Sequence, residues 1–457
     1  MTRAKELQIT EGPIFSALIR FAIPIMLTQL IQILFSAVDI SVLGHMAGTD
    51  AVASVGTTAS ITGIMIGLFS GFGTGLNIIL ARFVGARDSV RTKRAVSTSI
   101  LLAGAFGIVL MVVGFFFSPL ILDWIDCPEE CMEGATLYLR IYLLSSPAIL
   151  IYNFGSAVIR VAGDAKSPMY YIIAAGGLKV VLNYTLCFLM PNKVAAVAIS
   201  LLISQVFSAF LVVFHLVRIK GDCRLDLRHL CFDLKILKLI ILYGFYSSLT
   251  NTSYYIPNLI IQSSINSFGA AAITGNTAAT NLEAMFRCIF YGFTVAAAVF
   301  VGQNLGAERY DRVRTIIRYG FLFCGISSIA LSTVAYVFAE PLLRLYIGGS
   351  GPAVEAALYY GKARVIYVQL LSVLDALNNY MAQVLTTAGY PFVHTIGIFV
   401  SDIAARIFWM LVLLPKHHTI EFLYLCYPVS RFLFTIVLVV AFVIFWRKLR
   451  AGRLHKI

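Results

Sequence analysis

Long runs of apolar residues, separated by short polar or Gly/Pro breaks, dominate the chain. A helix needs about 20 apolar residues to cross a hydrocarbon core of about 30 Å. The pattern predicts twelve spans, at approximately 15–43, 53–81, 95–124, 138–162, 168–190, 193–218, 236–268, 272–302, 315–347, 359–388, 392–414 and 419–446. Strands of a membrane barrel would instead alternate over about ten residues, so we expect an all-α integral membrane protein.

Composition and charge agree with this class. Hydrophobic residues make up 59% of the chain and charged residues 12%, which does not fit a water-soluble surface. The net charge of +13 does not indicate nucleic acid, because the basic residues gather in alternate loops such as 87–94, 218–228 and 309–314 and in the final stretch 446–457. The positive-inside rule therefore predicts a multi-pass protein of the plasma or inner membrane, surrounded by lipid, with both termini in the cytoplasm.

The chain repeats itself after about 220 residues. The matches are "FAIPIMLTQ" (21–29) with "YGFYSSLTN" (243–251), Gly71-Phe72 and Gly85-Ala86 with Gly292-Phe293 and Gly306-Ala307, and Asn153 and "AGD" (162–164) with Asn379 and "AGY" (388–390), at shifts of 222, 221 and 226. Six spans per copy predict two lobes related by a pseudo-two-fold axis along the membrane normal, 1–221 and 222–457, joined by the cytoplasmic linker 218–235. Two facing bundles favour a carrier that works by alternating access over a channel.

A polar stripe runs along the first predicted span. Thr28, Gln32, Ser36 and Asp39 share one helical face. An ionisable side chain inside the bilayer costs about 2.5 to 3.5 kcal/mol, which makes Asp39 a functional candidate. Pro24 removes a backbone hydrogen bond about 22 Å from Asp39 along the axis, so a bend there linked to protonation of Asp39 is a candidate gate.

The seventh predicted span carries a second polar stripe. Its stripe is formed by Asn251, Tyr254, Asn258, Gln262 and Asn266. For both stripes the alternative is interhelical hydrogen bonding alone, worth about 0.6 kcal/mol per bond.

The fifth span carries Lys179 near its middle and Asn183 one turn further on, facing the same way. A lysine inside a predicted span is a further functional candidate, because a buried lysine can exchange protons. The alternative is that Lys179 snorkels to an interface.

These features resemble a known family. Pro24 and Asp39, "RVAGDAKSP" (160–168), "GQNLGAERYDRVR" (302–314) and the repeat of six and six spans are similar to the multidrug and toxic compound extrusion (MATE) transporters, in the DinF-like branch. The resemblance implies a V-shaped pair of lobes that exports organic, often cationic, compounds in exchange for protons or sodium ions.

The fifth span differs from the pattern of the DinF-like branch. In the DinF-like branch it reads Asn-x-x-x-Asp and helps the helix-1 acid to bind a cation, whereas here Lys179 and Asn183 occupy those places. The resemblance therefore implies that Lys179 is the cation that pairs with Asp39. Two unit charges about 4 Å apart repel by about 4 kcal/mol at an effective dielectric of 20, so we expect coupling to protons in preference to sodium at this site.

The C-terminal half supplies further candidates. Glu283 and Arg287 can pair at i and i+4, as can Asp402 and Arg406, while Asp375 is placed close to an acidic position of the NorM-like branch by the resemblance. The residues expected to line a substrate cavity are Thr28, Gln32, Ser36, Asn153, Tyr254, Asn258, Gln262, Glu283, Arg287, Asp375 and Arg406.

The predicted function is an antiporter that exports organic, mainly cationic, small molecules as a monomer, in exchange for protons, with sodium as the alternative coupling ion. No nucleotide loop, zinc pattern or nucleophile motif occurs in the sequence, so we expect neither an enzyme nor a cofactor or metal site. The rival within the superfamily is a flippase or exporter of lipid-linked or anionic substrates, which the intramembrane Lys179, Arg287, Arg406 and Arg431 keep open. A non-transporting scaffold or receptor is a second rival, although it would not need matched polar stripes.

Overall fold

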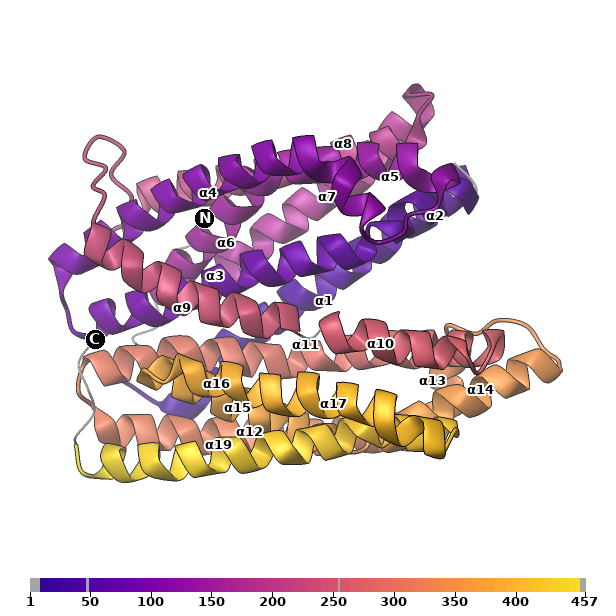
Figure 1. The fold of residues 1–457 in the computed structure, drawn as a ribbon. Helices are drawn as coiled ribbons and strands as arrows, with labels where there is room; N and C mark the ends of the chain where they lie inside the picture. The colour runs from indigo at the N-terminus through magenta and orange to yellow at the C-terminus, as the bar shows by residue number, and fades with distance from the viewer. Residues whose placement is uncertain (1–8, 47–48, 254, 453–457) are drawn as a thin grey trace. The chain divides into compact units, whose positions relative to one another are not determined.

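The computed structural model describes residues 9–46, 49–253 and 255–452, which form helices joined by short connections (Figure 1). The first half holds α1 (Ile14–Met46), α2 (Thr49–Thr57), α3 (Ala59–Gly85), α4 (Ser89–Asp123), α5 (Glu129–Leu144), α6 (Ser146–Val161), α7 (Lys166–Leu189) and α8 (Lys193–Arg218). No strand occurs in these described residues or in those of the second half, so the all-helical prediction is confirmed.

The second half is more broken. It holds α9 (Leu234–Ser253), α10 (Tyr255–Asn266), α11 (Ala270–Gly306), α12 (Tyr310–Val337), α13 (Ala339–Arg344), α14 (Pro352–Arg364), η1 (Val365–Gln369), α15 (Ser372–Ala388), α16 (Pro391–Ile398), η2 (Phe399–Ala404), α17 (Ala405–Phe408), η3 (Trp409–Leu413), η4 (Leu414–Lys416), α18 (Ile420–Tyr424) and α19 (Cys426–Arg450). The elements η1, η2 and η3 are π-helical, and η4 is a 3-10 turn.

Nine helical stretches in the described part of the chain are long and apolar enough to cross a membrane. A tenth is added when α5 and α6, which meet at a bend of 43°, are taken as one span. The two other predicted spans, 236–268 and 359–388, are divided into the shorter helices α9 and α10 and α14 and α15. The number twelve therefore stays a prediction.

By packing, the chain forms two compact units. Unit 1 includes Leu27–Ser248, and unit 2 combines Thr10–Met26 with Leu249–Ile457. Both boundaries fall inside a helix, after Met26 in α1 and after Ser248 in α9, and these two residues are 222 positions apart, which is the shift of the repeat. The first parts of α1 and α9 are thus exchanged between the units, whereas the predicted division at 221/222 follows the sequence repeat.

Side-chain contacts show how the exchanged parts are held. In unit 2, the ring of Phe21 in α1 lies 5.3 Å from that of Phe300 in α11. In unit 1, the hydroxyl of Ser248 in α9 donates to the Leu68 carbonyl of α3 at 2.8 Å. The first part of α1 therefore packs within unit 2, and the first part of α9 packs within unit 1.

The repeat is also visible in the backbone. Within unit 1, α6 packs on α3 and α4, and within unit 2, α15 packs in the same way on α11 and α12. Arg87 and Glu308, 221 positions apart, have φ of 55° and 56°, and Gly163 and Gly389, 226 apart, have φ of 98° and 107°. These shifts equal those read from the sequence, so the matched motifs form matching turns.

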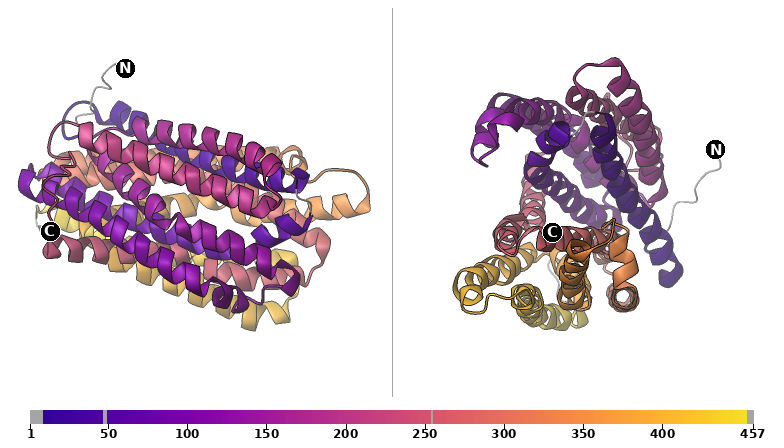
Figure 2. Two further views of the ribbon diagram at one scale, coloured as in Figure 1. Left: turned by 90° about the horizontal axis from the view of Figure 1, so that it is seen from above. Right: turned by 90° about the vertical axis from the view of Figure 1, so that its right-hand side faces the viewer.

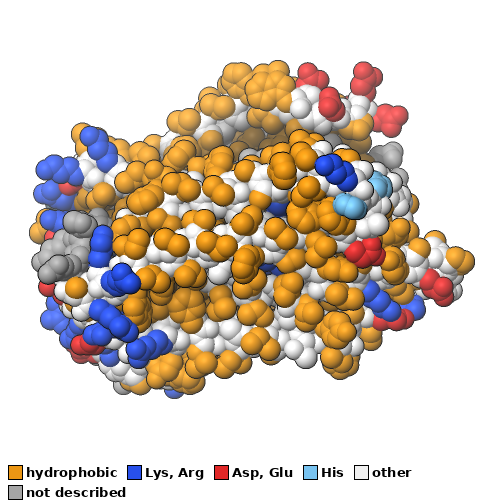
Figure 3. Space-filling model, turned by 60° about the horizontal axis from the view of Figure 1, so that its bottom comes forward, with side chains coloured by type: hydrophobic (Ala, Val, Ile, Leu, Met, Phe, Trp, Pro, Cys, Tyr) orange, Lys and Arg blue, Asp and Glu red, His pale blue; other side chains and the backbone are white. Residues whose placement is uncertain are grey.

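The surface of the helices fits a lipid environment. The helices of each unit run alongside one another (Figure 2), and large apolar side chains such as Phe188 and Phe116 are 82% and 70% exposed. In Figure 3, hydrophobic side chains cover the flanks of the helices, and Lys and Arg gather at one end. This distribution is that of membrane-spanning helices with a basic face on one side of the bilayer.

Candidate functional site

The acid of the α1 stripe forms the centre of a polar site inside unit 1. The ammonium of Lys179 contacts Oδ2 of Asp39, and Nδ2 of Asn183 donates to Oδ1 of the same carboxylate at 2.7 Å. The side chains of Lys179 and Asp39 are only 10% and 15% exposed. The pairing expected from the sequence is therefore present in the structure.

The two donors come from one helix because Lys179 and Asn183 lie one turn apart on the same face of α7. Asn183 is fully buried, and its Oδ1 has no hydrogen-bond partner in the described part of the chain. A buried acceptor without a partner is costly, so this oxygen has capacity for one further donor.

Apolar contacts close the site along the helix axes. On one side, the ring of Phe35 in α1 lies over Gly176 of α7, where a Cβ would come 1.7 Å from a ring carbon. On the other side, Val42 and Leu43 of α1 pack with Cys187 of α7. Gly176 thus allows the close approach of α1 and α7 that brings Asp39 to Lys179.

Sequence reasoning missed one neighbour of this site. The phenol of Tyr138 in α5 lies close enough to Asp39 for their charges to interact. Tyr138 carries no periodic signal that links it to a residue 99 positions earlier, so only the fold reveals it.

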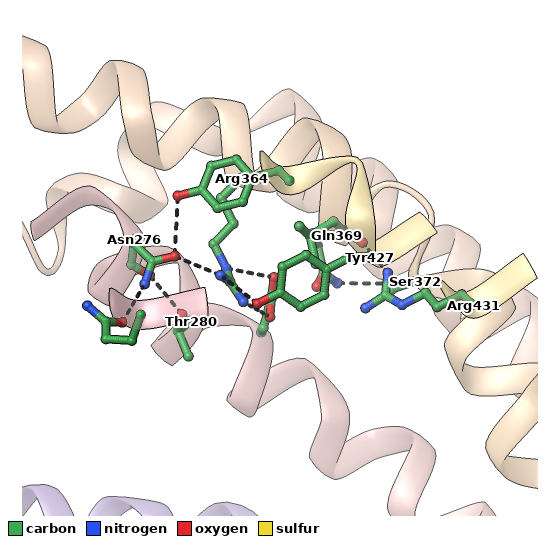
Figure 4. Close-up of polar contacts among 11 residues, drawn as sticks. Asn276, Thr280, Arg364, Gln369, Ser372, Tyr427 and Arg431 are labelled. Atoms are coloured by element: carbon green, nitrogen blue, oxygen red, sulfur yellow. Dashed lines mark hydrogen bonds and ion pairs between the residues drawn. The ribbon is translucent and has the colours of Figure 1, made fainter. Parts of the chain in front are cut away.

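A second polar network lies inside unit 2 (Figure 4). Arg364 of α14 donates through Nη2 and Nε to the two carboxylate oxygens of Glu283 in α11, at 3.0 and 3.2 Å. Its Nη1 donates to Oδ1 of Asn276 at 2.7 Å. The side chains of Arg364 and Glu283 are 3% and 9% exposed, so this is a buried, two-pronged ion pair.

The predicted stripe of the seventh span joins this network. Nδ2 of Asn276 donates to Oε1 of Gln262 at 3.3 Å, and Nε2 of Gln262 donates to Asn266 at 3.0 Å. The hydroxyl of Tyr424 also donates to Asn276, at 3.2 Å. Asn276 thus links Gln262 to Arg364, and Arg364 links it to Glu283. The two-pronged contact with Glu283 comes from Arg364 and not from its i, i+4 neighbour Arg287.

The other ionisable candidates of unit 2 have partners of their own. Arg406 pairs with Asp402 at 2.5 Å, as the i, i+4 spacing predicts, and its Nε donates to the Ser430 hydroxyl at 2.9 Å. Asp375 accepts from Nδ2 of Asn379 at 3.1 Å.

The remaining predicted cavity residues are placed by the fold as follows. Thr28 and Gln32 are half-buried and Ser36 is exposed on α1, and the Ser36 hydroxyl donates to the Gln32 carbonyl. Asn153 donates to the Ile149 carbonyl of its own helix, α6, at 2.9 Å. Asn258 is half-buried on α10, whereas Tyr254 lies outside the described residues.

Pro24 is buried inside α1. It belongs to the part of α1 that packs with unit 2, two residues before the boundary at Met26, whereas Asp39 belongs to unit 1. The break in the helical hydrogen bonding therefore lies beside the place where α1 passes from one unit to the other.

No group of three or more His, Cys, Asp or Glu side chains that could hold a metal ion occurs among residues 9–46, 49–253 and 255–452. Each carboxylate described above is instead matched by a basic or amide side chain.

Comparison with known proteins agrees with this architecture. The MatE family model matches residues 24–185 and 247–407, once in each repeat. The chain is 25% identical over 361 residues to the probable multidrug resistance protein YoeA of Bacillus subtilis, covering 78% of this chain and 77% of that protein. It is 20% identical to the multidrug export protein MepA of Staphylococcus aureus, covering 74% of each.

The fold is likewise similar to a solved structure. The outward-facing structure of a multidrug resistance MATE family transporter of the MOP superfamily matches 98% of this chain and 99% of its own, with a TM-score of 0.87 and 20% identity. Members of this family are transporters and not enzymes. With both repeats matched by the family model, the chain belongs to the MatE family of multidrug efflux transporters.

Proposed function

We propose that this transporter is an antiporter that exports organic cations in exchange for protons, with Asp39 as the coupling acid. The observation that carries the proposal is the contact of both Asp39 oxygens with N–H donors of α7, from Lys179 and Asn183. A proton on Asp39 would break the ion pair, and loss of that proton would restore it, so the contact between α1 and α7 depends on protonation.

The composition of the site favours a proton over sodium. A metal cation needs several oxygen ligands, whereas the Asp39 carboxylate already accepts from two nitrogens, one of them an ammonium. That fixed positive charge repels a second cation by about 4 kcal/mol at about 4 Å and an effective dielectric of 20. Pro24 is the proposed gate, because α1 can bend there while Asp39 changes its protonation.

Purified protein in liposomes tests the proposal. Uptake of ethidium, a fluorescent organic cation, is measured under a pH gradient and under a sodium gradient without a pH gradient. We expect the pH gradient alone to drive transport in the wild type, and Asp39→Asn to abolish that transport. The proposal fails if Asp39→Asn transports like the wild type or if sodium alone drives the wild type equally well.

A second candidate is the export of anionic compounds by the same carrier. Nη1 of Arg431 in α19 donates to the Val368 carbonyl, and its Nε is buried without a partner in the described part of the chain. No ion pair to a carboxylate is present for Arg431 in that part of the chain. Replacing ethidium by an organic anion of similar size in the same liposomes distinguishes the two, because anion-only transport would exclude the cation proposal.

For orientation we propose that the basic ends of the helices, including the linker 218–235 and both termini, lie in the cytoplasm. The support is the gathering of Lys and Arg in 87–94, 218–228 and 309–314.

A further inference from the structure

Unit 2 contains a cavity of about 400 Å³ between the start of α12 and the end of α19. Its lining includes four arginines, Arg309, Arg312, Arg314 and Arg450, and two acids, Glu308 and Asp311. The charged groups of this lining sum to two positive charges. Glu11 lies 3.6 Å from Nη2 of Arg309 and lowers the local excess to one positive charge, which still favours an anionic occupant.

Arg309 and Arg312 make structural hydrogen bonds to the segment before α1. Nη1 of Arg309 donates to the Thr10 carbonyl at 2.7 Å, and Nη1 of Arg312 donates to the Gly12 carbonyl at 3.0 Å. They hold the segment that leads into α1. Arg314 contacts Asp311 with a third of its side chain exposed, and Arg450 is exposed with its guanidinium 5.9 Å from the Trp446 ring. Arg314 and Arg450 are therefore the two with capacity for a ligand.

The repeat shows what occupies the corresponding place in unit 1. Ser89 and Lys93 correspond to Tyr310 and Arg314 at the shift of 221. There the Ser89 hydroxyl donates to Oδ1 of Asp222 at 2.5 Å, and Nζ of Lys93 lies 3.7 Å from the same oxygen. A carboxylate of the linker thus sits on the basic segment of unit 1, whereas the matching segment of unit 2 borders an open cavity.

The cavity also lies at the right level for a lipid headgroup. It is bordered by the first residues of one membrane-crossing stretch, Tyr310–Val337, and the last residues of another, Ile420–Arg450. Lys and Arg gather at this end of the helices (Figure 3). Basic pockets between spans at this level bind anionic headgroups, and the planar guanidinium suits phosphate oxygens.

We propose that this cavity binds the phosphate group of an anionic phospholipid of the surrounding leaflet, through Arg314 and Arg450. This site is separate from Asp39 and goes beyond the proposed antiport function. Free phosphate presents the same oxygens, so the test must distinguish the two sources.

The test uses delipidated full-length protein in detergent, native mass spectrometry and two lipids with equal acyl chains, phosphatidylglycerol and phosphatidylcholine. The site variant is Arg314→Gln/Arg450→Gln. The matched control is Arg318→Gln/Arg447→Gln, which removes the same charge about one turn away on the same two helices, outside the cavity lining. We expect phosphatidylglycerol to bind the site variant about tenfold or more weakly than the control, because charge-assisted hydrogen bonds are lost.

Equal weakening in the two double variants, or phosphatidylcholine binding as tightly as phosphatidylglycerol, would overturn the proposal. Inorganic phosphate is added in a parallel arm, and we expect it not to displace the lipid at millimolar concentration. Displacement by phosphate that is lost in the site variant would assign the cavity to soluble phosphate and overturn the lipid assignment. Intact ethidium transport in the site variant shows that the double replacement leaves the protein folded.

Discussion

The ammonium of Lys179 lies against one carboxylate oxygen of Asp39, within unit 1, and joins the middle of α7 to the last third of α1. Asn183 holds the other oxygen, and the apolar contacts of Phe35 and Leu43 enclose the group. With so little exposure, the pair is held by direct contact and not screened by solvent. The packing of α1 against α7 therefore depends on whether Asp39 is charged.

Replacing Lys179 by asparagine should make transport respond to sodium. Lys179→Asn removes the ammonium and, together with Asn183, leaves two amide oxygens beside Asp39. Removal of a repulsion of about 4 kcal/mol should raise the affinity of this carboxylate for sodium by roughly a thousandfold at most. Ethidium transport in liposomes, measured against external sodium concentration, checks this.

Lys179→Arg is the matched control, since it keeps the positive charge and should stay independent of sodium. Unchanged coupling in Lys179→Asn would show that the ammonium does not decide which ion is used.

Breaking the buried ion pair of unit 2 should destabilise the protein strongly. Glu283→Gln leaves the Arg364 guanidinium buried without its counter-charge, and loss of one partner of such a pair costs about 3–5 kcal/mol. The double variant Glu283→Gln/Arg364→Met should recover part of this loss, because no uncompensated charge remains. The thermal midpoint of the purified protein in detergent is the measurement.

An exposed pair provides the comparison for Glu283. Glu340 pairs with Arg344 and Lys362, and these side chains are 41–46% exposed. Glu340→Gln should therefore change stability by at most about 1 kcal/mol. Equal effects of the two Glu→Gln replacements would contradict the assignment of the Glu283 pair as a buried, structure-determining contact.

A methyl group at Gly75 should disturb the attachment of the exchanged part of α9. A Cβ there would lie 2.4 Å from the backbone nitrogen of Gly244, and backbone cannot move aside as a side chain can. We expect Gly75→Ala to lower the free energy of unfolding by about 1–3 kcal/mol. The same replacement at Gly104 meets nothing within 4 Å and should be neutral or stabilising by up to about 1 kcal/mol, because alanine favours a helix. Similar thermal midpoints for the two variants would refute the close packing.

The orientation can be checked with two native cysteines. Cys231 is exposed in the linker 218–235. Cys131 is partly exposed in the first turn of α5, at the end of the helices that the charge pattern places outside. In variants that keep one of the two and replace the other seven cysteines by alanine, a membrane-impermeant maleimide should label Cys131 in intact cells. Cys231 should react only after permeabilisation. The reverse order would invert the proposed topology.

Much of this architecture could be predicted from the sequence because apolar runs and short-range spacing carry it. The shifts of 221 and 226 reappear as similar positive φ angles at Arg87 and Glu308 and at Gly163 and Gly389. The contact of Lys179 with Asp39 could be predicted because the family resemblance places the position of Lys179 beside the helix-1 acid, and because the two residues are opposite charges inside predicted spans.

Contacts between residues far apart in the chain could not be predicted from the sequence. Glu283 has a basic neighbour at Arg287, one turn away, and nothing in the spacing indicates that Arg364, 81 positions later, forms the two-pronged contact. The exchange of helix parts at Met26 and Ser248 could not be predicted either. Apolar periodicity predicts that a helix is buried, but an apolar face does not specify which neighbour covers it.

The exchange at Met26 and Ser248 also bears on how the protein is made. The beginning of α1 leaves the ribosome early, yet the ring of Phe21 packs against that of Phe300, which is synthesised almost 280 residues later. The first repeat synthesised alone would lack the stretch ending at Ser248 and would carry an uncovered stretch ending at Met26. We therefore expect each repeat to complete its packing only after the other has been synthesised.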